Sequence, residues 1–394
     1  MKRIYCTFIF FICGPILFLC LLFRHWLSPS GMNNPQIHPK GDLKLGTLIT
    51  NELSRLLRPD IPTVEDVADT VVRTWFKHQE EFCQKVLNGT HQLFKSKECQ
   101  NSCLDLDKPY TRRIVIITPY RSRAEHLMKL IPRLVELLTK QKLCYLLIVA
   151  EQIDQQPFNK GVLMNTGFVE ALNWLPFHCA IFHDVDLLPL NNEVDYTCSI
   201  YPKHLSLCVD KFQNRLPYIE LIGGVLSMPL KAFLRVNGYS NLFWGWGAED
   251  DDMYERLMIN GIPVTRPDPN VAQFIMLKHK PSPAFHSALR TQILSFTKVR
   301  YRLDGINSLN YTLVESRIIL YNQIHSLINN NVSTAADSSH KTNAFGSLTK
   351  SNYPILHLKI DVGRTLKCYI FFNSILQYNF PCLFTSYFCI SIFQ

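Results

Sequence analysis

The fold is decided by residues 113–150, which read RIVIITPYRSRAEHLMKLIPRLVELLTKQKLCYLLIVA. The apolar run from Ile114 to Ile117 predicts a buried strand, because its side chains are all aliphatic. Residues 124–138 then repeat apolar side chains at helical spacing, and residues 145–149 form a second apolar run. The stretch therefore predicts a strand, a helix and a strand in succession.

The same alternation continues toward the C-terminus. Residues 161–174 are helix-like, and residues 179–182 form a third apolar run. Strands that alternate with helices indicate a parallel sheet in an α/β domain. Ligands of such sheets bind beyond the carboxyl ends of the strands. Here all three strands are followed by polar residues, two of the segments being basic, which suits an anion such as a nucleotide diphosphate.

Asp184 and Asp186 flank Val185 directly after the third predicted strand. If the strand persists, the two carboxylates point the same way, because side chains alternate with period two. Such a pair suits a ribose or a hard cation such as Mg²⁺ or Mn²⁺, which would neutralise charge on a diphosphate leaving group. A D-x-D pattern alone leaves both interpretations open.

A second candidate site is the stretch Asn241-Leu-Phe-Trp-Gly-Trp-Gly-Ala-Glu-Asp-Asp-Asp252. Glycine allows the backbone to approach a ligand, tryptophan offers a stacking face, and crowded carboxylates suit a general base, sugar hydroxyls or a cation. The alternative is a solvated acidic helix start, because acids are favourable in the first turn of a helix.

The net charge of +9 raises the question of an acidic partner. Only residues 290–302 (RTQILSFTKVRYR) resemble a basic stripe with aromatic residues between the charges. We interpret that pattern as a solvated helix face and predict no nucleic-acid binding. The length of 394 residues allows one large domain with appendages.

The N-terminus has the composition of a membrane anchor. Residues 4–23 are uncharged and mostly apolar, which is about the length of a bilayer span. A cleaved signal peptide would have a shorter apolar run and a small-residue cleavage site. The basic Lys2-Arg3 pair favours a cytoplasmic tail of residues 1–3 and a lumenal remainder.

The sequons and cysteines agree with a secretory lumen. Asn88, Asn310 and Asn331 each begin a glycosylation sequon. Seven of the thirteen cysteines lie between residues 83 and 208. Because seven is an odd number, at least one of these seven cannot form a disulfide with another of them.

We assign residues 24–110 to a lumenal stem. Within it, Thr63 to Leu87 predicts a capped amphipathic helix, because Thr63-x-x-Asp66 precedes apolar residues at helical spacing. We expect this helix to be a spacer or a self-association surface. The anchor and the stem are therefore the two segments through which a homodimer could form.

Taken together, the segments between residues 110 and 315 resemble the β-1,4-galactosyltransferase family of Golgi type II membrane enzymes. The matching words are Thr118-Pro-Tyr-Arg121, Phe158-Asn-Lys160, His183-Asp-Val-Asp-Leu-Leu-Pro189, Asp210-Lys-Phe212, Leu216-Pro-Tyr218, Gly223-Gly-Val225, Phe243-Trp-Gly-Trp-Gly-Ala-Glu-Asp-Asp-Asp252, Met276-x-x-His279 and Asp304-Gly-Ile-Asn-Ser-Leu309. Their number and order make chance similarity a poor explanation.

The resemblance implies a GT-A-type α/β domain over residues 111–320 with a mixed, mostly parallel sheet, a UDP-sugar donor and Mn²⁺ as cofactor. It implies Asp250 as the base, helped by Glu249, and the metal ligands Asp186, Met276 and His279. The implied donor-binding residues are Pro119, Tyr120, Arg121, Arg123, Phe158, Lys160, Asp184, Val185, Lys211, Leu221 and Trp246, and the implied acceptor-binding residues are Gly247, Asp251 and Arg290. It also implies a disulfide between Cys179 and Cys198. From the residues alone Met276 would be a core methionine, because Mn²⁺ prefers oxygen ligands.

Three positions depart from the family pattern. Lys160 replaces an arginine and loses its bidentate fork. Ala248 stands where many members have glycine, and its methyl group fits only if the backbone there avoids positive φ. Leu221 stands in line with a tyrosine of the vertebrate galactosyl enzymes, as in invertebrate members that transfer N-acetylgalactosamine, and the lost phenol makes room for an N-acetyl group.

The pattern is interrupted after Leu309. Residues 353–367 resemble the closing segment of the family, so residues 321–352, rich in Asn and Ser, are expected to be a disordered insertion. Residues 368–394 form an apolar tail without a family counterpart, for which a second span or a mistaken gene-model end are the two explanations.

The leading hypothesis is an inverting, manganese-dependent β-1,4-glycosyltransferase of the Golgi membrane. It would move N-acetylgalactosamine or galactose from UDP to a terminal N-acetylglucosamine of a glycoprotein or glycolipid. One alternative is the xylose-acceptor branch of the same family, which His183 to Asn191 resembles. The other is a catalytically silent lumenal sugar-binding relative.

Overall fold

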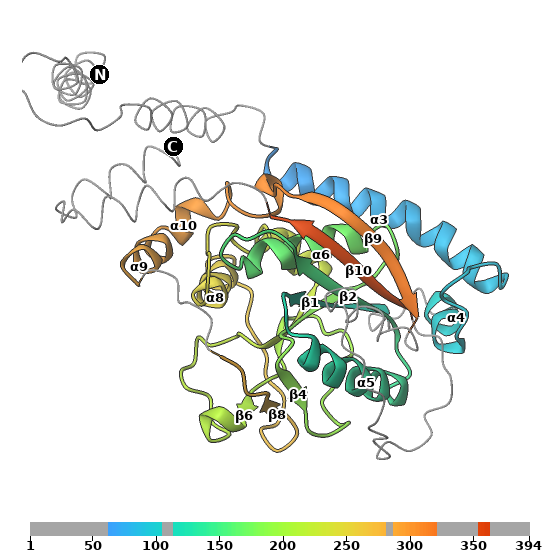
Figure 1. The fold of residues 1–394 in the computed structure, drawn as a ribbon. Helices are drawn as coiled ribbons and strands as arrows, with labels where there is room; N and C mark the ends of the chain where they lie inside the picture. Colours follow the sequence, from blue (N-terminus) through green and yellow to red (C-terminus); the bar gives the residue numbers. More distant parts are fainter. Residues whose placement is uncertain (1–61, 105–112, 281–286, 321–353, 363–394) are drawn as a thin grey trace, which may run out of the picture. The chain divides into compact units, whose positions relative to one another are not determined.

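The computed structural model describes residues 62–104, 113–280, 287–320 and 354–362. The elements predicted from residues 113–182 are all present. They are β1 (Arg113–Tyr120), α5 (Ala124–Lys140), β2 (Cys144–Gln152), α6 (Lys160–Ala171) and β3 (Cys179–His183). The expected α/β domain is therefore confirmed, and Figure 1 shows its sheet between helices.

The main sheet has the order β5-β7-β3-β1-β2-β10-β9. The additional strands are β5 (Lys203–His204), β7 (Val225–Pro229), β9 (Thr312–Leu320) and β10 (Pro354–Asp361). β1 runs parallel to β2 and β3, and β10 runs parallel to β2. The other three neighbouring pairs are antiparallel, so the sheet is mixed, and our expectation of a mostly parallel sheet holds only for its four central strands.

The sheet separates two apolar layers, because alternate side chains of each strand point to opposite faces. Val115 and Ile117 of β1 pack in the layer that contains α6, whereas Ile114 and Ile116 pack in the layer that contains α5. All four side chains are buried. The near-continuous aliphatic run of β1 is thus the consequence of coverage on both faces.

A second, three-stranded sheet consists of β4 (Leu187–Pro189), β8 (Gln273–Met276) and β6 (Cys208–Val209). Leu187 pairs with Met276 across the antiparallel β4 and β8. This small sheet therefore brings residues that are about ninety positions apart beside the end of β3.

The predicted capped helix is α3 (Val64–Leu87), and Thr63 and Asp66 form its capping box. It does not act as a separate spacer. Phe82 and Val86 are buried in the layer that contains α6, and Trp75 Nε1 donates to Phe177 O at 2.6 Å. α4 (Lys97–Leu104) follows, and the Cys99–Cys144 disulfide joins it to β2. Our expectation that the helix is a spacer within the stem is therefore wrong for α3, because its apolar face packs on the domain.

The remaining helices are α7 (Leu230–Arg235), α8 (Glu249–Ile259), α9 (Ser287–Ser295) and α10 (Thr297–Arg300), with 3-10 turns at Asp210–Phe212 and Ile306–Ser308. The predicted anchor (4–23), insertion (321–352) and apolar tail (368–394) lie outside the described residues. Within the described ranges, no helix has both the length and the apolar composition needed to cross a bilayer.

Candidate functional site

A pocket opens where β3 ends and α8 begins. Its lining residues come from α6, from β3 and the loop after it, from the glycine pair and β7, from the loop after α7, and from the start of α8: Lys160, Met164, Phe182, Asp184, Ile222, Gly223, Gly224, Leu226, Tyr239, Glu249 and Asp250. The pocket thus joins the two stretches that the sequence singled out, the D-x-D and the acids after Trp246.

Lys160 links these two stretches electrostatically. Its Nζ lies 2.8 Å from Asp184 Oδ1 and 3.1 Å from Glu249 Oε1. Burial opposes a charge on Lys160, but Asp184 and then Glu249 raise its pKa well above the usual value. Lys160 therefore carries a fixed positive charge between the donor candidates and the acidic helix start.

Asp250 has the most perturbed environment among these acids. Burial, and next the charge of Glu249, raise its pKa to about 7, although Lys160 opposes the shift. The carboxylate lies against the backbone of Gly223, where any side chain would collide with Asp250 Oδ2. A carboxyl group with a pKa near neutrality in a pocket is suited to general base chemistry.

Ala248, the residue before α8, adopts φ +79° in the left-handed region. The condition that we set for tolerating alanine is therefore not met, because a Cβ is unfavourable there. The residue is also buried, so its methyl group sits in the apolar layer around α8. Backbone strain is thus located directly beside Glu249 and Asp250.

The acceptor candidates lie on the outer side of the same turn. Tyr218 donates its O–H to Asp251 Oδ1 at 2.9 Å, and burial, together with Asp250, raises the pKa of this tyrosine. Trp246, one of the donor candidates, lies in the same turn and is 64% exposed, which leaves its ring free to stack on a sugar. A methyl group on Gly247 would lie 3.0 Å from Arg290 Nη1, so Arg290 approaches the turn closely. Tyr218 belongs to the segment Leu216-Pro-Tyr218 that resembles the family, but the sequence assigned it no role in the site.

Asp186 lies with the other two metal candidates. β3 ends at His183, so the strand does not continue through Asp184 and Asp186, and the condition of our expectation that they share one strand face is not met. Asp186 Oδ2 is 2.7 Å from His279 Nε2, and Arg123 Nη1 donates to it at 3.1 Å. Met276 lies in β8, paired with Leu187, the residue after Asp186.

Asp186 and His279 both face a positive group, which is the kind of partner that a divalent cation would be. That group is Arg123, which contacts Asp186 and also approaches His279 Nδ1 at 3.2 Å. Within the described ranges no three His, Cys, Asp or Glu side chains form a metal cluster. The candidate set contains two such side chains, and its third member is a thioether.

The other donor candidates divide into two groups. Arg121 stacks on Phe158, with Cζ 5.3 Å from the ring centre, and Pro119 and Tyr120 end β1 nearby. Val185 is buried in the turn after β3. By contrast, Lys211 is exposed on the turn at Asp210–Phe212, and Leu221 is half-buried beside the pocket residue Ile222.

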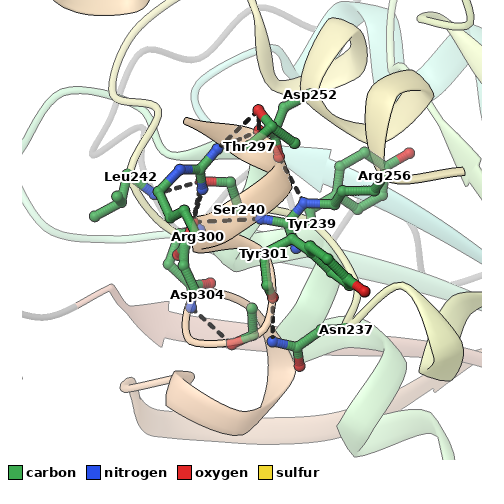
Figure 2. A network of polar contacts seen from close by, with 12 residues as sticks. Asn237, Tyr239, Ser240, Leu242, Asp252, Arg256, Thr297, Arg300, Tyr301 and Asp304 are labelled. Atoms are coloured by element: carbon green, nitrogen blue, oxygen red, sulfur yellow. Dashed lines mark hydrogen bonds and ion pairs between the residues drawn. The ribbon is translucent and has the colours of Figure 1, made fainter. Parts of the chain in front are cut away.

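Asp252 belongs to a closed ionic network on the far side of α8 (Figure 2). It pairs with Arg256 Nε at 2.6 Å and with Arg300, and Asp304 pairs with the same two arginines. All four side chains are almost completely buried. Burial disfavours a charged Asp252, but Arg256 and Arg300 outweigh it and lower the pKa.

The network corrects one expectation from the sequence. We interpreted residues 290–302 as a solvated helix face, yet Arg300 is only 1% exposed. The local signals were the spacings of Asp252 with Arg256 and of Arg300 with Asp304, each of which is that of neighbours on a helix. The pairing of Arg300 with Asp252 had no local signal, because these two residues lie 48 positions apart.

The cysteine pairing agrees with the resemblance. Cys179 and Cys198 form a disulfide, as do Cys83 and Cys103, and Cys208 is the free, buried thiol of the described residues. Asn88 and Asn310 are exposed and so remain candidates for glycosylation, whereas Asn331 lies outside the described residues.

Comparisons with known proteins agree with this geometry. A family model described as the N-terminal region of glycosyl transferase group 7 matches residues 74–199, and one described as the N-terminal domain of galactosyltransferase matches residues 203–280. The chain is 37% identical over 225 residues to β-1,4-galactosyltransferase 5 of Danio rerio, covering 57% of this chain and 59% of that protein. It is 37% identical over 244 residues to β-1,4-galactosyltransferase 1 of Bos taurus, covering 58% and 60%.

A solved structure shares the fold. The catalytic domain of Drosophila β-1,4-galactosyltransferase 7 in complex with xylobiose superposes with a TM-score of 0.50 at 23% identity, covering 65% of this chain and 97% of that one. The chain matches about three fifths of the length of the curated relatives. On the family models and these relatives, the chain belongs to the β-1,4-galactosyltransferase family of glycosyltransferase group 7.

Proposed function

We propose that the protein is an inverting β-1,4-glycosyltransferase that uses a UDP-sugar donor and a terminal N-acetylglucosamine acceptor. The observation that carries the proposal is the position of Asp250. It lines the pocket between Lys160 and Gly223, its pKa is raised to about 7, and the exposed Trp246 lies on the preceding turn.

Asp250 is the proposed base. It would accept the proton of the acceptor hydroxyl as that oxygen attacks the anomeric carbon, and UDP would leave from the opposite face. A single displacement of this kind needs one positioned base and inverts the anomeric configuration. Glu249 would place the sugars, and Asp251, oriented by Tyr218, would bind the acceptor.

The diphosphate side has its own set of residues. Arg121 and Arg123 are the proposed contacts, and Pro119 and Phe158 would hold the uridine. Lys160 differs from what we expected of it, because its charge faces Asp184 and Glu249. We therefore give Lys160 the additional role of holding the donor and acceptor sides of the pocket together.

A divalent cation such as Mn²⁺ would be held by Asp186, His279 and Met276. When bound it supplies positive charge that stabilises the departing diphosphate. Arg123 contacts both Asp186 and His279, so it orients these two donors.

We further propose a preference for UDP-N-acetylgalactosamine. Leu221 and the pocket residue Ile222 are both aliphatic, which leaves room for an N-acetyl group and offers no hydroxyl to a smaller donor. Rates with both UDP-sugars test this directly. Faster galactose transfer by the wild type contradicts the preference, and Leu221→Tyr should move the ratio toward galactose.

Activity itself is tested with the full chain by manganese-dependent release of UDP in the presence of acceptor. Arrays that carry N-acetylglucosamine and xylose acceptors distinguish the two branches of the family. A folded wild type that binds sugar but releases no UDP would favour the catalytically silent alternative. The cellular part of the proposal is a type II Golgi enzyme anchored by residues 4–23, which localisation of a tagged full chain tests.

A further inference from the structure

One arginine outside the pocket holds the whole segment from Ser240 to Asp252, which carries Trp246 and the acids. Arg300 of α10 donates from Nη1 to Ser240 Oγ at 2.9 Å. Its Cζ lies 5.7 Å from the centre of the Phe243 ring. Its Nη2 pairs with Asp252. A single guanidinium thus contacts Ser240 and Phe243 near the start of the segment and Asp252 at its end.

Asp304 closes the same arrangement from the other side. It pairs with Arg300 and accepts hydrogen bonds from Ser240 Oγ at 2.6 Å and from the backbone N–H of Asn241 at 2.9 Å. Arg256 donates to the backbone oxygen of Gly238 at 2.9 Å. Figure 2 shows Ser240, Asp252 and Asp304 gathered around Arg300.

The geometry of α8 explains why this network matters for the pocket. Successive residues of a helix are rotated by about 100° around its axis, so Asp250 and Asp252 point to nearly opposite sides. Asp252 is held from behind by Arg300, Arg256 and Thr297, whose Oγ1 donates to it at 2.6 Å. Fixing Asp252 therefore fixes the rotation at which Asp250 enters the pocket.

We propose that Arg300 is a positioning residue that sets the orientation of the acceptor-side segment Ser240–Asp252 without touching either substrate. The proposal rests on the proposed function, since the acceptor is taken to bind at Asp250 and Asp251. The donor-side residues Arg121, Phe158 and Asp184 make no contact with Arg300 among the described interactions. The segment reaches the donor side only at Gly245, whose N–H donates to Phe158 O at 2.7 Å, and at Glu249, which pairs with Lys160, among the described contacts, so donor binding should change far less than transfer.

An arginine is suited to this place because its planar fork reaches two carboxylates and a hydroxyl at once. Lysine keeps the charge but offers a single ammonium group. Arg300→Lys should therefore preserve charge balance in the network and loosen its geometry, whereas Arg300→Met also leaves Asp252 and Asp304 with one cation between them.

The matched control is Arg113→Lys. Arg113 is equally buried, but it donates to Pro176 O at 2.9 Å and to Ser102 O at 3.3 Å, at the junction of β1 with α4. This variant should report the general effect of losing a buried guanidinium. We would compare the full-length variants by steady-state kinetics, by calorimetric titration of UDP-sugar, and by amide hydrogen exchange of residues 240–252.

In Arg300→Lys we expect UDP-sugar affinity to stay within about twofold of wild type and acceptor-dependent transfer per folded molecule to fall by at least about tenfold, because small misplacements of reacting groups are costly. Exchange of residues 240–252 should quicken selectively. Arg300→Met should show the same pattern more strongly, and Arg113→Lys should show neither effect.

Wild-type transfer in folded Arg300→Lys, or an equal loss of donor affinity and transfer, overturns the proposal. Unchanged exchange in residues 240–252 also overturns it. If the wild type itself neither binds UDP-sugar nor transfers, the proposed function fails. The exchange experiment still decides in that case whether Arg300 positions the segment.

Discussion

Asp250 and Asp252 lie in the same turn of α8 but face opposite environments. Asp250 lines an open pocket, and burial next to Glu249 raises its pKa to about 7. Asp252 is enclosed by two arginines that lower its pKa. One side of the helix thus holds a carboxylate that readily takes a proton, and the other holds one that resists protonation.

The difference shows how a reactive group and its support are divided within one helical turn. Charge on Asp250 is unfavourable for the fold, which is the usual condition of a group with a perturbed pKa at a functional site. Charge on Asp252 is compensated by Arg256 and Arg300. The two carboxylates should therefore respond in opposite ways to the same substitution.

Asp250→Asn should have the largest effect, a loss of transfer by about 10²–10⁴-fold, because it removes the proposed general base. Kinetics with a saturating donor measure it. A variant that retains more than a tenth of wild-type turnover would contradict the role of Asp250.

The same variant should be more stable than wild type above neutral pH. A raised pKa means that the folded state binds the proton of Asp250 more tightly than the unfolded state, so wild-type stability falls as pH rises from the usual aspartate range through about 7. Unfolding by urea at several pH values should show the two proteins converging at low pH.

Asp252→Asn should lower the free energy of unfolding by about 3–5 kcal/mol, because it leaves buried positive charge without its partner. The loss is expected above the usual aspartate pKa and should shrink as pH falls, since the depressed pKa of Asp252 stabilises the fold only while the group is ionised. Urea titrations measure it.

Glu81→Gln is the matched control for Asp252→Asn. Glu81 is a solvent-exposed acid paired with Lys85 at 2.6 Å on α3, and its loss should leave stability unchanged within error. Equal losses of unfolding free energy in the two variants would show that the buried Asp252 network stabilises the fold no more than an exposed ion pair does.

Lys160→Met should move the acidic limb of the kcat/KM profile to higher pH. Lys160 lowers the pKa of Asp250, and its removal leaves burial and Glu249 unopposed. Lys160→Arg keeps the charge and should leave the limb in place. An unchanged or lower limb in Lys160→Met would show that Asp250 does not control it.

Ala248→Gly should have the smallest effect, a gain in stability of under about 1 kcal/mol, because glycine relieves the positive φ but increases the entropy of the unfolded chain. Ala232→Gly in α7 is the control, since a helical alanine should lose stability when replaced. A loss in both variants would mean that the packing of the Ala248 methyl group outweighs the strain.

Much of the fold followed from residues 113–182, where the alternation of apolar runs predicted β1, α5, β2, α6 and β3. Such patterns are local and report burial directly. The sequence missed that β7 and β9 run antiparallel to their neighbours and that α3 packs on the domain. Both depend on where distant segments meet.

By itself the sequence determined the α/β order of elements, the candidate acids after Trp246 and the D-x-D, because each is written in neighbouring residues. Only the tertiary structure decided which carboxylate faces what: that Asp186 meets His279 and Arg123, that Lys160 joins Asp184 to Glu249, and that Arg300 encloses Asp252. The physical reason is that burial and charge pairing depend on distances through space. The four consecutive acids Glu249–Asp252 are therefore chemically alike in sequence, but the pKa of Asp250 is raised and the pKa of Asp252 is lowered.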